Sequence, residues 1–384
     1  MRPMIKPEHL PVRYGEDRVR IGGIVRGIAA DIEDPGGWVW ALLETLDGVR
    51  TTDQVVTDLV RLHPERSRAD VLAAIEDLVR AGYVEDADQP VPEGLSAVER
   101  ERYGRSAALF RWMDRTPRRS SWDTQMVLRQ ARVVVVGIGG VGCTAAQTLV
   151  VSGVGHVHCV EPDTVELSNL NRQILYTEHD LGRPKAIAAV DRLRGYNSDV
   201  HVTGEELTVD GPAVLRRLSA GFDVLLLAAD QPQEIRSWAN QACTATGTAW
   251  VHGGYHGPQV SFGLYRPGAG PCYDCARVAE QERRAALPPR TCSATFGRAT
   301  RGQAANAVSA GVAGQLAAHA VLALLTGVPS VRTNCQFGFN LVTLQDSFAL
   351  GPEAPRPDCP TCGAAAGQRY GGGSASARAA SSRA

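Results

Sequence analysis

The sequence lacks an excess of either charge, a secretory signal and an uninterrupted apolar segment. Its 384 residues carry 40 basic and 41 acidic side chains, so neither nucleic acid nor an anionic membrane is indicated as a partner. Residues 1–6 contain no apolar core of a signal peptide. The most apolar late stretch, 304–325, is interrupted by Asn306, Gln315 and His319, which favours a buried Ala-rich helix over a membrane span.

The length is sufficient for two domains or more, and no long internal repeat is present. Nine cysteines without a secretory signal indicate reduced thiols or metal ligands in a cytoplasmic protein. Composition predicts four segments: a small α+β, winged-helix-like domain at 1–90, a linker with entry helices at 91–130, a main domain at 131–363 and a disordered Gly/Ala/Ser-rich tail at 364–384.

The first segment has β-rich stretches at 18–32, with a glycine pair at 22–23 that suggests a hairpin. Three amphipathic helices are expected to follow, capped near Asp34, Asp53 and Asp70. The main domain starts with a β-branched run at 133–136, typical of a buried parallel strand. Strands and helices then alternate, which predicts an α/β fold with a doubly wound, mostly parallel Rossmann-like sheet.

Four glycines, Gly137, Gly139, Gly140 and Gly142, join the first strand of that domain to its first helix. Such a turn lets backbone N–H groups approach a nucleotide, and Glu161 follows at a spacing typical of an acid that binds ribose hydroxyls. On its own, this pattern also fits an ordinary dinucleotide-binding domain.

The run at 168–173 is much more specific, because it places Asn and Arg side chains beside the glycine turn, and Lys185 follows. Those residue types suit a triphosphate better than a nicotinamide cofactor. Asp230 stands at the end of another predicted strand, with Gln231 next to it and Arg236 six residues after it.

These features, in this order over residues 99–362, resemble the ThiF/MoeB/MccB family, relatives of ubiquitin-activating enzymes that adenylate a carboxylate with ATP and magnesium. The resemblance implies that Arg105, in the RYxR-like segment 102–105, acts in the partner subunit of a homodimer, and that Asp230 holds Mg²⁺. It assigns nucleotide contacts to Gly137, Gly139, Gly140, Gly142, Glu161, Ser168, Asn169, Asn171, Arg172, Lys185, Asp230 and Gln231.

Adenylation of a carboxylate requires the kinds of side chain found among these residues. Attack of a carboxylate on the α-phosphate brings two anions together, so charge neutralisation and alignment are the main tasks. Arg105, Arg172 and Lys185 supply fixed cations, and the carboxylate of Asp230 suits a hard cation. A carboxylate nucleophile is already ionised near neutral pH, so no general base is needed.

Two C-x₂-C pairs, Cys272/Cys275 and Cys359/Cys362, predict a tetrahedral structural zinc site. Disulfides and an iron–sulfur cluster are the alternatives. Cys292 matches the position where some relatives carry a thiol that receives the activated group. The alternative, an unused loop cysteine, is favoured because peptide-modifying relatives often work without such a thiol. His252 and His256 are expected after the next strand, either lining an acceptor pocket or serving a structural role.

Residues 1–85 resemble a PqqD-type peptide-recognition element, which binds the leader of a ribosomally made precursor as an extra strand on an open sheet edge. The alternative is a winged-helix unit used for dimer contacts or DNA. The combined prediction is an enzyme that adenylates a carboxylate of a leader-bearing precursor peptide. Its rivals are a sulfur-carrier adenylyltransferase, a non-catalytic leader-presenting partner of a cyclodehydratase and, more remotely, a dehydrogenase.

Overall fold

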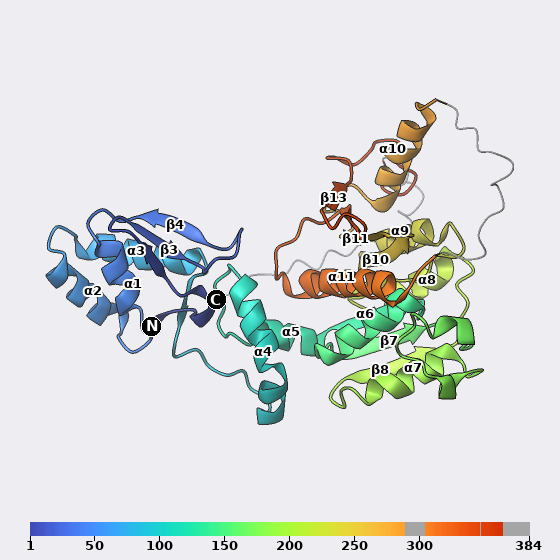
Figure 1. The fold of residues 1–384 in the computed structure, drawn as a ribbon, viewed down its shortest axis with the longest axis horizontal. Helices are drawn as coiled ribbons and strands as arrows, with labels where there is room; N and C mark the ends of the chain where they lie inside the picture. The colour runs from blue at the N-terminus through green and yellow to red at the C-terminus, as the bar shows by residue number, and fades with distance from the viewer. Residues whose placement is uncertain (289–303, 346, 364–384) are drawn as a thin grey trace. The chain divides into compact units, whose positions relative to one another are not determined.

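The computed structural model describes residues 1–288, 304–345 and 347–363. Cys292 lies outside the described residues. So does the tail from residue 364, for which the sequence predicts disorder. The chain divides into two compact units, residues 1–128 (unit 1) and the remainder (unit 2), which are described separately (Figure 1).

Unit 1 combines a three-stranded antiparallel sheet of order β2-β3-β4, a two-stranded sheet β1-β5 and a group of helices. Its strands are β1 (Pro3–Ile5), β2 (Val12–Tyr14), β3 (Arg18–Ile21), β4 (Ala30–Glu33) and β5 (Val84–Asp86). Its helices are η1 (Pro7–His9), α1 (Trp38–Thr45), α2 (Thr52–Leu62), α3 (Arg68–Arg80), α4 (Ala97–Met113) and α5 (Asp123–Gln130), which runs into unit 2. The predicted small α+β domain is therefore present.

The local details of unit 1 differ from the sequence prediction. The segment at residues 24–25, predicted to be β-rich, is a turn within the loop that joins β3 to β4. The N-caps of α2 and α3 are Thr51 and Ser67, while Asp70 completes a capping box from the third helical position. Asp34 does act at α1, because its carboxylate accepts from the backbone N–H groups of the first turn although Gly37 is the N-cap.

The core of unit 1 forms where the apolar stripes of α1, α2 and α3 meet the inner face of the sheet. Val55, Val56, Leu59 and Val71 have no solvent exposure, and the strand residue Val19 joins them. Hydrophobic burial on this scale accounts for a stable small domain.

One lysine is also buried in unit 1. Lys6 is 5 % exposed and donates to the backbone carbonyls of Asp114, at 2.7 Å, and Arg111, at 3.3 Å. Desolvation lowers its pKa, against the attraction of nearby carboxylates. Lys6 thus ties β1 to the end of α4.

Unit 2 is built on one sheet of order β13-β12-β11-β10-β9-β6-β7-β8. The strands from β10 through β8 pair in parallel, and β10 to β13 pair antiparallel. Their bounds are β6 (Arg132–Val136), β7 (His156–Val160), β8 (His201–Glu205), β9 (Val224–Leu227), β10 (Ala249–His256), β11 (Gln259–Tyr265), β12 (Cys335–Asn340) and β13 (Ser347–Leu350). The order reverses between β6 and β9, which is where ligands collect in doubly wound sheets.

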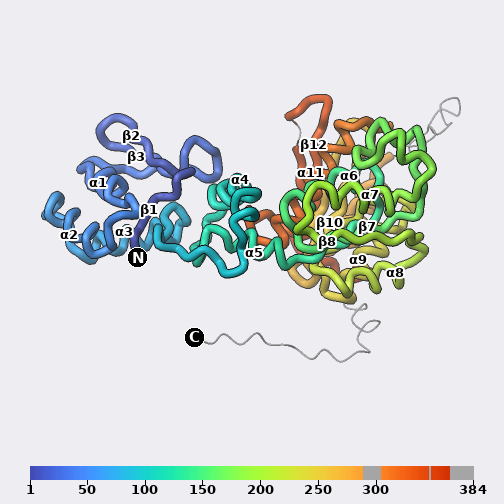
Figure 2. The backbone as a smooth tube through the Cα atoms, turned by 90° about the horizontal axis from the view of Figure 1, so that it is seen from below, coloured from blue at the N-terminus to red at the C-terminus, as the bar shows by residue number. Residues whose placement is uncertain are grey.

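The helices of unit 2 flank this sheet (Figure 2). They are α6 (Gly140–Val151), α7 (Lys185–Arg194), α8 (Pro212–Ser219), α9 (Ile235–Thr246), α10 (Tyr273–Ala285) and α11 (Ala307–Thr326), with short 3-10 turns η2 (Leu167–Asn169) and η3 (Glu178–Asp180). The buried run 133–136 of β6 and the helices between parallel strands confirm the predicted α/β doubly wound class.

Helix α11 is long and apolar enough to cross a membrane, and no other helix of the described residues passes that test. It packs against α6, β10 and β11, however, and 56 % of its most apolar window is buried inside the protein. Small side chains such as Ala313, Ala317 and Ala320 allow that close approach. It is the buried Ala-rich helix that the sequence predicts.

Candidate nucleotide site and four-cysteine cluster

A cavity of about 700 Å³ lies at the carboxyl ends of β6, β7 and β9, where the strand order reverses. Its floor is the glycine turn between β6 and α6, and its walls come from the segments that follow β7, β8 and β9 and from the last residues of β10. The predicted cofactor residues on its lining are Gly137, Gly139, Gly140, Glu161, Asn169, Arg172, Lys185, Asp230 and Gln231.

Two glycines shape the turn. Gly137 has φ +92°, and a Cβ on it would lie 2.6 Å from the backbone nitrogen of Ala229. A Cβ on Gly142, which does not line the cavity, would lie 1.9 Å from the carbonyl oxygen of Gly137. Gly142 therefore lets α6 pack against the turn, and Gly137 lets the turn pack against the end of β9.

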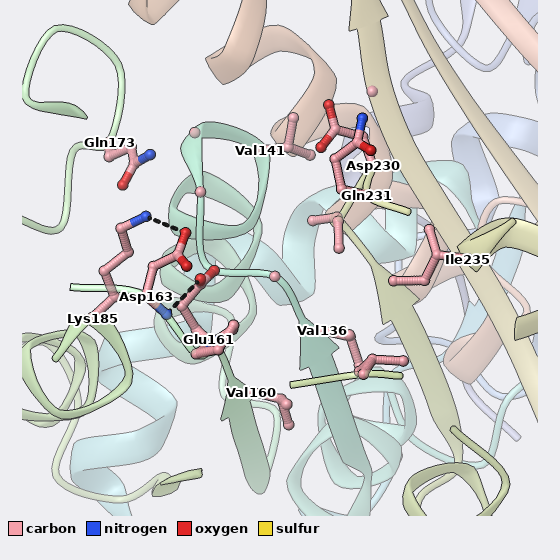
Figure 3. Close-up of a pocket in the computed structure, with 18 of the residues that line it drawn as sticks. Val136, Val141, Val160, Glu161, Asp163, Gln173, Lys185, Asp230, Gln231 and Ile235 are labelled. Carbon is pink, nitrogen blue, oxygen red and sulfur yellow. Dashed lines mark hydrogen bonds and ion pairs between the residues drawn. The ribbon is translucent and has the colours of Figure 1, made fainter. Parts of the chain in front are cut away.

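One polar group stands at the end of β7 (Figure 3). The carboxylate of Glu161 accepts from the backbone N–H groups of Ile138, at 2.7 Å, and Asp163, at 3.2 Å. Burial raises the pKa of Glu161, while the charge of Lys185 and these two bonds oppose the rise. The ammonium of Lys185, itself 5 % exposed, lies 3.3 Å from a carboxylate oxygen of Asp163.

A second group stands across the glycine turn, after β9. Figure 3 shows Asp230 and Gln231 there, apart from Glu161 and Lys185. Asp230 is exposed to the cavity, and in the described part of the chain no side chain donates to its carboxylate. Arg236, in the first turn of α9, lines the same wall, and a Cβ on Gly254 would lie 2.9 Å from its Nη2.

Arg172 is held by its neighbours in sequence. Its Nη1 donates to the backbone carbonyl of Ser168 at 3.0 Å and to the side chain of Asn171 at 3.1 Å. It has no carboxylate partner among residues 1–288, 304–345 and 347–363. Ser168 and Asn171, predicted to contact the nucleotide, do not line the cavity and instead orient this guanidinium toward it.

Sequence reasoning missed several lining residues. Asp163 pairs with Lys185, and its place two residues beyond Glu161 at a strand end could have indicated it. Gln173 is 4 % exposed, and its Oε1 has no partner among the described residues. Gly253 and Gly254, which bring the end of β10 to the cavity, carry the same glycine signal as the first turn.

For His252 the acceptor-pocket alternative is wrong and the structural alternative is confirmed. Both histidines belong to β10, and His252 lies within it, with no solvent exposure, packed among the rings of Trp250, Tyr265 and Tyr273. Desolvation lowers its pKa well below the usual value. It does not line the cavity, because its place on the strand turns it into the core.

The four predicted metal ligands converge. The sulfurs of Cys272, Cys275, Cys359 and Cys362 all lie within 4.8 Å of one another. Sγ–Sγ distances are 3.9 Å for Cys272–Cys275, 3.5 Å for Cys272–Cys359 and 3.4 Å for Cys275–Cys362. A tetrahedral ion with Zn–S bonds of about 2.3 Å places sulfurs roughly 3.8 Å apart, whereas a disulfide needs about 2.05 Å. The donor set and spacing fit zinc and exclude disulfides here.

Arg105 lies on the exposed face of α4 in unit 1, whereas the cavity belongs to unit 2. Its predicted role in a partner subunit therefore stays a prediction. The same holds for the thiol function of Cys292, which is not among the described residues.

The model of the ThiF family matches residues 113–361. The chain is 33 % identical over 236 residues to the SAMP-activating enzyme E1 of Haloferax volcanii, which covers 62 % of this chain and 82 % of the relative. It is 32 % identical over 246 residues to the sulfur carrier protein ThiS adenylyltransferase of Escherichia coli, covering 63 % of this chain and 89 % of that protein.

Among solved structures, Escherichia coli MccB resembles this chain with a TM-score of 0.77 and 21 % identity over 94 % of this chain and 96 % of MccB. MccB with AMPCPP and MccA gives a TM-score of 0.72 at 20 % identity, covering 94 % of this chain and 99 % of MccB. At this identity the likeness shows the fold, and it extends over both units.

Proposed function

The chain belongs to the ThiF family and is an ATP-dependent adenylyltransferase of that family, and from this premise we propose that it activates a carboxylate of a precursor peptide held by unit 1. The observation that carries the proposal is a cavity at the strand-order reversal whose lining combines cationic and carboxylate side chains. The same chain adds a small sheet domain outside the region matched by the family model. The family model begins at residue 113, so residues 1–112 lie outside it.

In the proposed reaction, a peptide carboxylate oxygen bonds to the α-phosphorus of ATP, and the bond from that phosphorus to the pyrophosphate oxygen breaks. The products are an acyl-AMP mixed anhydride and pyrophosphate. Arg172 and Lys185 would balance the phosphate charge, and Lys185 would exchange Asp163 for a phosphate oxygen. Glu161 would accept from ribose hydroxyls with the lone pairs that its two backbone bonds leave.

Asp230 would hold Mg²⁺, because its exposed carboxylate offers the hard oxygen ligands that this ion prefers. Bound there, the ion would supply charge neutralisation at the phosphates. The four-cysteine cluster would hold structural zinc, since four thiolates close the coordination shell and leave no position for a substrate.

Unit 1 would bind the leader by strand addition. The sheet order β2-β3-β4 leaves two edge strands, β2 and β4, and β4 packs more closely against the hydrophobic core. Ala30 and Ile32 of β4 are half-buried against the core, while all three residues of β2 are exposed. A peptide strand on β4 would continue a face that already has hydrophobic support. The protein would work as a homodimer in which Arg105 reaches the partner's nucleotide.

Pyrophosphate–ATP exchange with and without candidate precursor peptides tests the proposal. We expect exchange that depends on the peptide and falls by about 10²–10³-fold in Asp230→Ala and Arg172→Ala variants. Exchange that survives both substitutions would overturn the site. If the native protein, with Mg²⁺ and its peptide, neither binds nor cleaves ATP, the protein is a leader-presenting platform instead.

A second candidate is activation of a sulfur-carrier protein. The observation in its favour is that the relatives at 32–33 % identity carry the names of carrier-activating enzymes. Exchange stimulated by a carrier with a Gly-Gly end, and by no leader-bearing peptide, would establish it. Deleting the carrier's last two residues is the matched control.

A further inference from the structure

The four-cysteine cluster is connected to a wall of the cavity through one buried carboxylate. Asp274, in the first turn of α10, has no solvent exposure. Its Oδ1 accepts from Ser237, at 2.7 Å, and from Nε of Arg277, at 3.0 Å. Its Oδ2 accepts from Asn240, at 3.0 Å, and from Thr361, at 2.6 Å.

Three of these donors come from the two segments that the carboxylate of Asp274 joins, namely helix α9 and the second cysteine pair. Thr361 lies between Cys359 and Cys362, in the second cysteine pair, and Asp274 lies within the first. Ser237 and Asn240 belong to α9. A single carboxylate thus binds both cysteine pairs to one helix.

Asn240 adds a direct contact with a cluster sulfur. Its side chain is 1 % exposed, and its Nδ2 donates to Sγ of Cys272 at 3.3 Å. Its Oδ1 accepts from the backbone N–H of Tyr273 at 3.3 Å. The orientation of the amide is therefore fixed on both sides, with its N–H groups toward the sulfur and the carboxylate.

The N-terminal part of α9, which holds these two contacts, also forms a wall of the cavity. Ile235 and Arg236 line the cavity from its first turn, and Asp230, Gln231 and Pro232 do so from the loop before it. Arg236, which lines the cavity, directly precedes Ser237, which donates to Asp274 beside the cluster. Adjacent residues of one helix therefore contact the two sites. Because a helix moves as a rigid rod, a shift of α9 displaces both contacts.

We propose that the metal-loaded cluster positions α9, through Asp274 and Asn240, so that Arg236 and Asp230 face the nucleotide and metal occupancy is coupled to nucleotide affinity. This inference rests on the proposed function in one respect, namely that the cavity binds ATP. Asp274 and Asn240 are positioning residues, because neither lines the cavity.

Only a carboxylate satisfies all four donors. In Asp274→Asn the new amide nitrogen would face either the Nδ2 of Asn240 or the Nε of Arg277, both of which are donors. Rotating the amide of Asn240 would break its bonds to Cys272 and Tyr273. The substitution keeps all four cysteines and nearly the same volume, yet loosens α9.

The test measures linkage in the full-length protein with a non-hydrolysable ATP analogue and Mg²⁺. Zinc affinity is determined by competition with a colorimetric chelator, with and without the analogue, and nucleotide affinity by calorimetry. The ratio of the two zinc affinities gives the coupling factor, and calorimetry on zinc-loaded protein compares nucleotide affinity between variants. We expect the analogue to tighten zinc binding by at least about 5-fold.

The variants localise the coupling without requiring zinc-free protein to stay folded. Zinc-loaded Asp274→Asn, with zinc stoichiometry verified, should bind the analogue at least about 5-fold more weakly and lose most of the coupling. Ser237→Ala, which removes one α9 bond, should shift both quantities in the same direction by less. Arg356→Ala is the matched control, because its side chain pairs with Glu282 and Asp358 beside the cluster and not with α9.

The outcomes separate this inference from the proposed function. Wild-type nucleotide affinity in zinc-loaded Asp274→Asn, or equal zinc affinity with and without the analogue, would overturn the coupling while leaving adenylation intact. An effect of Arg356→Ala as large as that of Asp274→Asn would also overturn it, since general loosening of the cluster would then suffice. Absence of nucleotide binding in every form would overturn both proposals.

Discussion

The cavity of unit 2 and the sheet of unit 1 offer different features to a ligand. In the cavity, charged side chains such as Arg172, Lys185 and Asp230 face one space. In unit 1, the available feature is the unpaired backbone of edge strands over an apolar core. The first arrangement depends on individual side chains, and the second depends on the fold, so substitutions should affect them differently.

The largest effect is expected at Arg172. Arg172→Ala should reduce pyrophosphate exchange by about 10²–10³-fold because a preorganised cation is removed. Affinity for a leader peptide, measured by fluorescence anisotropy, should not change. Asn171→Ala removes one bond that orients the guanidinium and should cost only about 10-fold or less. Equal losses in both variants would contradict the distinction between contact and orientation.

A core substitution in unit 1 should have the complementary effect. Leu59 has no solvent exposure, so Leu59→Ala should destabilise unit 1 by about 2–5 kcal/mol. Calorimetry should show an earlier transition for unit 1, and above it exchange should lose its response to peptide while the peptide-independent level persists. Leu62→Ala is the control, because Leu62 ends the same helix and is 59 % exposed. Loss of all ATP chemistry together with the unit 1 transition would contradict the separation.

The pH dependence of nucleotide binding should follow Glu161. Burial raises its pKa above the usual value of 4.5, so acidification protonates it before an ordinary glutamate and removes acceptors for the ribose. Nucleotide affinity should therefore fall by several-fold as pH falls through the raised pKa. The contribution of Glu161 to unit 2 stability has the opposite sign, since a raised native pKa favours the folded state at low pH and that stability is lost as pH rises.

Calorimetric titrations from pH 7 to pH 5 would measure this dependence, with Glu161→Gln as the control that cancels titration of the phosphates themselves. The variant should bind more weakly at pH 7 and show a flatter profile. Identical profiles for the two proteins would assign the pH dependence to the ligand.

The smallest expected effect is a difference between β4 and β2 in how strongly peptide binding protects their backbone amides from hydrogen exchange. If a leader strand pairs with β4, amide hydrogen exchange in residues 30–33 should slow on peptide binding, while exchange in residues 12–14 should not. Mass spectrometry resolves the two segments. Protection at β2 alone would place the peptide on the other edge and leave the role of unit 1 intact.

Much of the parallel sheet follows from sequence because its signals are local. The run at 133–136 is β-branched throughout and is buried throughout, since both faces of a central parallel strand are covered. The antiparallel extension of that sheet through β11, β12 and β13 was not predicted, because those pairings join segments far apart in the chain. The edge strand β2 was missed because its three residues are all exposed and show no alternation.

The site divides in the same way. The sequence indicated Glu161 and Lys185 but not their partners, since the backbone N–H of Ile138 meets Glu161, and Asp163 meets Lys185, only through folding. His252 was predicted to follow the strand because the residues after Trp250 carry no signal that the strand continues. In the structure β10 extends to His256 and includes His252. The cysteine spacing predicted the cluster, whereas its connection to α9 depends on Asp274, which no pattern indicates.

The burial of both lysines has a practical consequence. Lysine occurs only at positions 6 and 185, and each is 5 % exposed, so every other basic side chain of the chain is an arginine. A guanidinium stays protonated at neutral pH and is a poor nucleophile there. Amine-directed dyes and immobilisation reagents should therefore find no exposed side-chain amine, and a reactive acyl group that escapes into solution would modify other molecules in preference to this one.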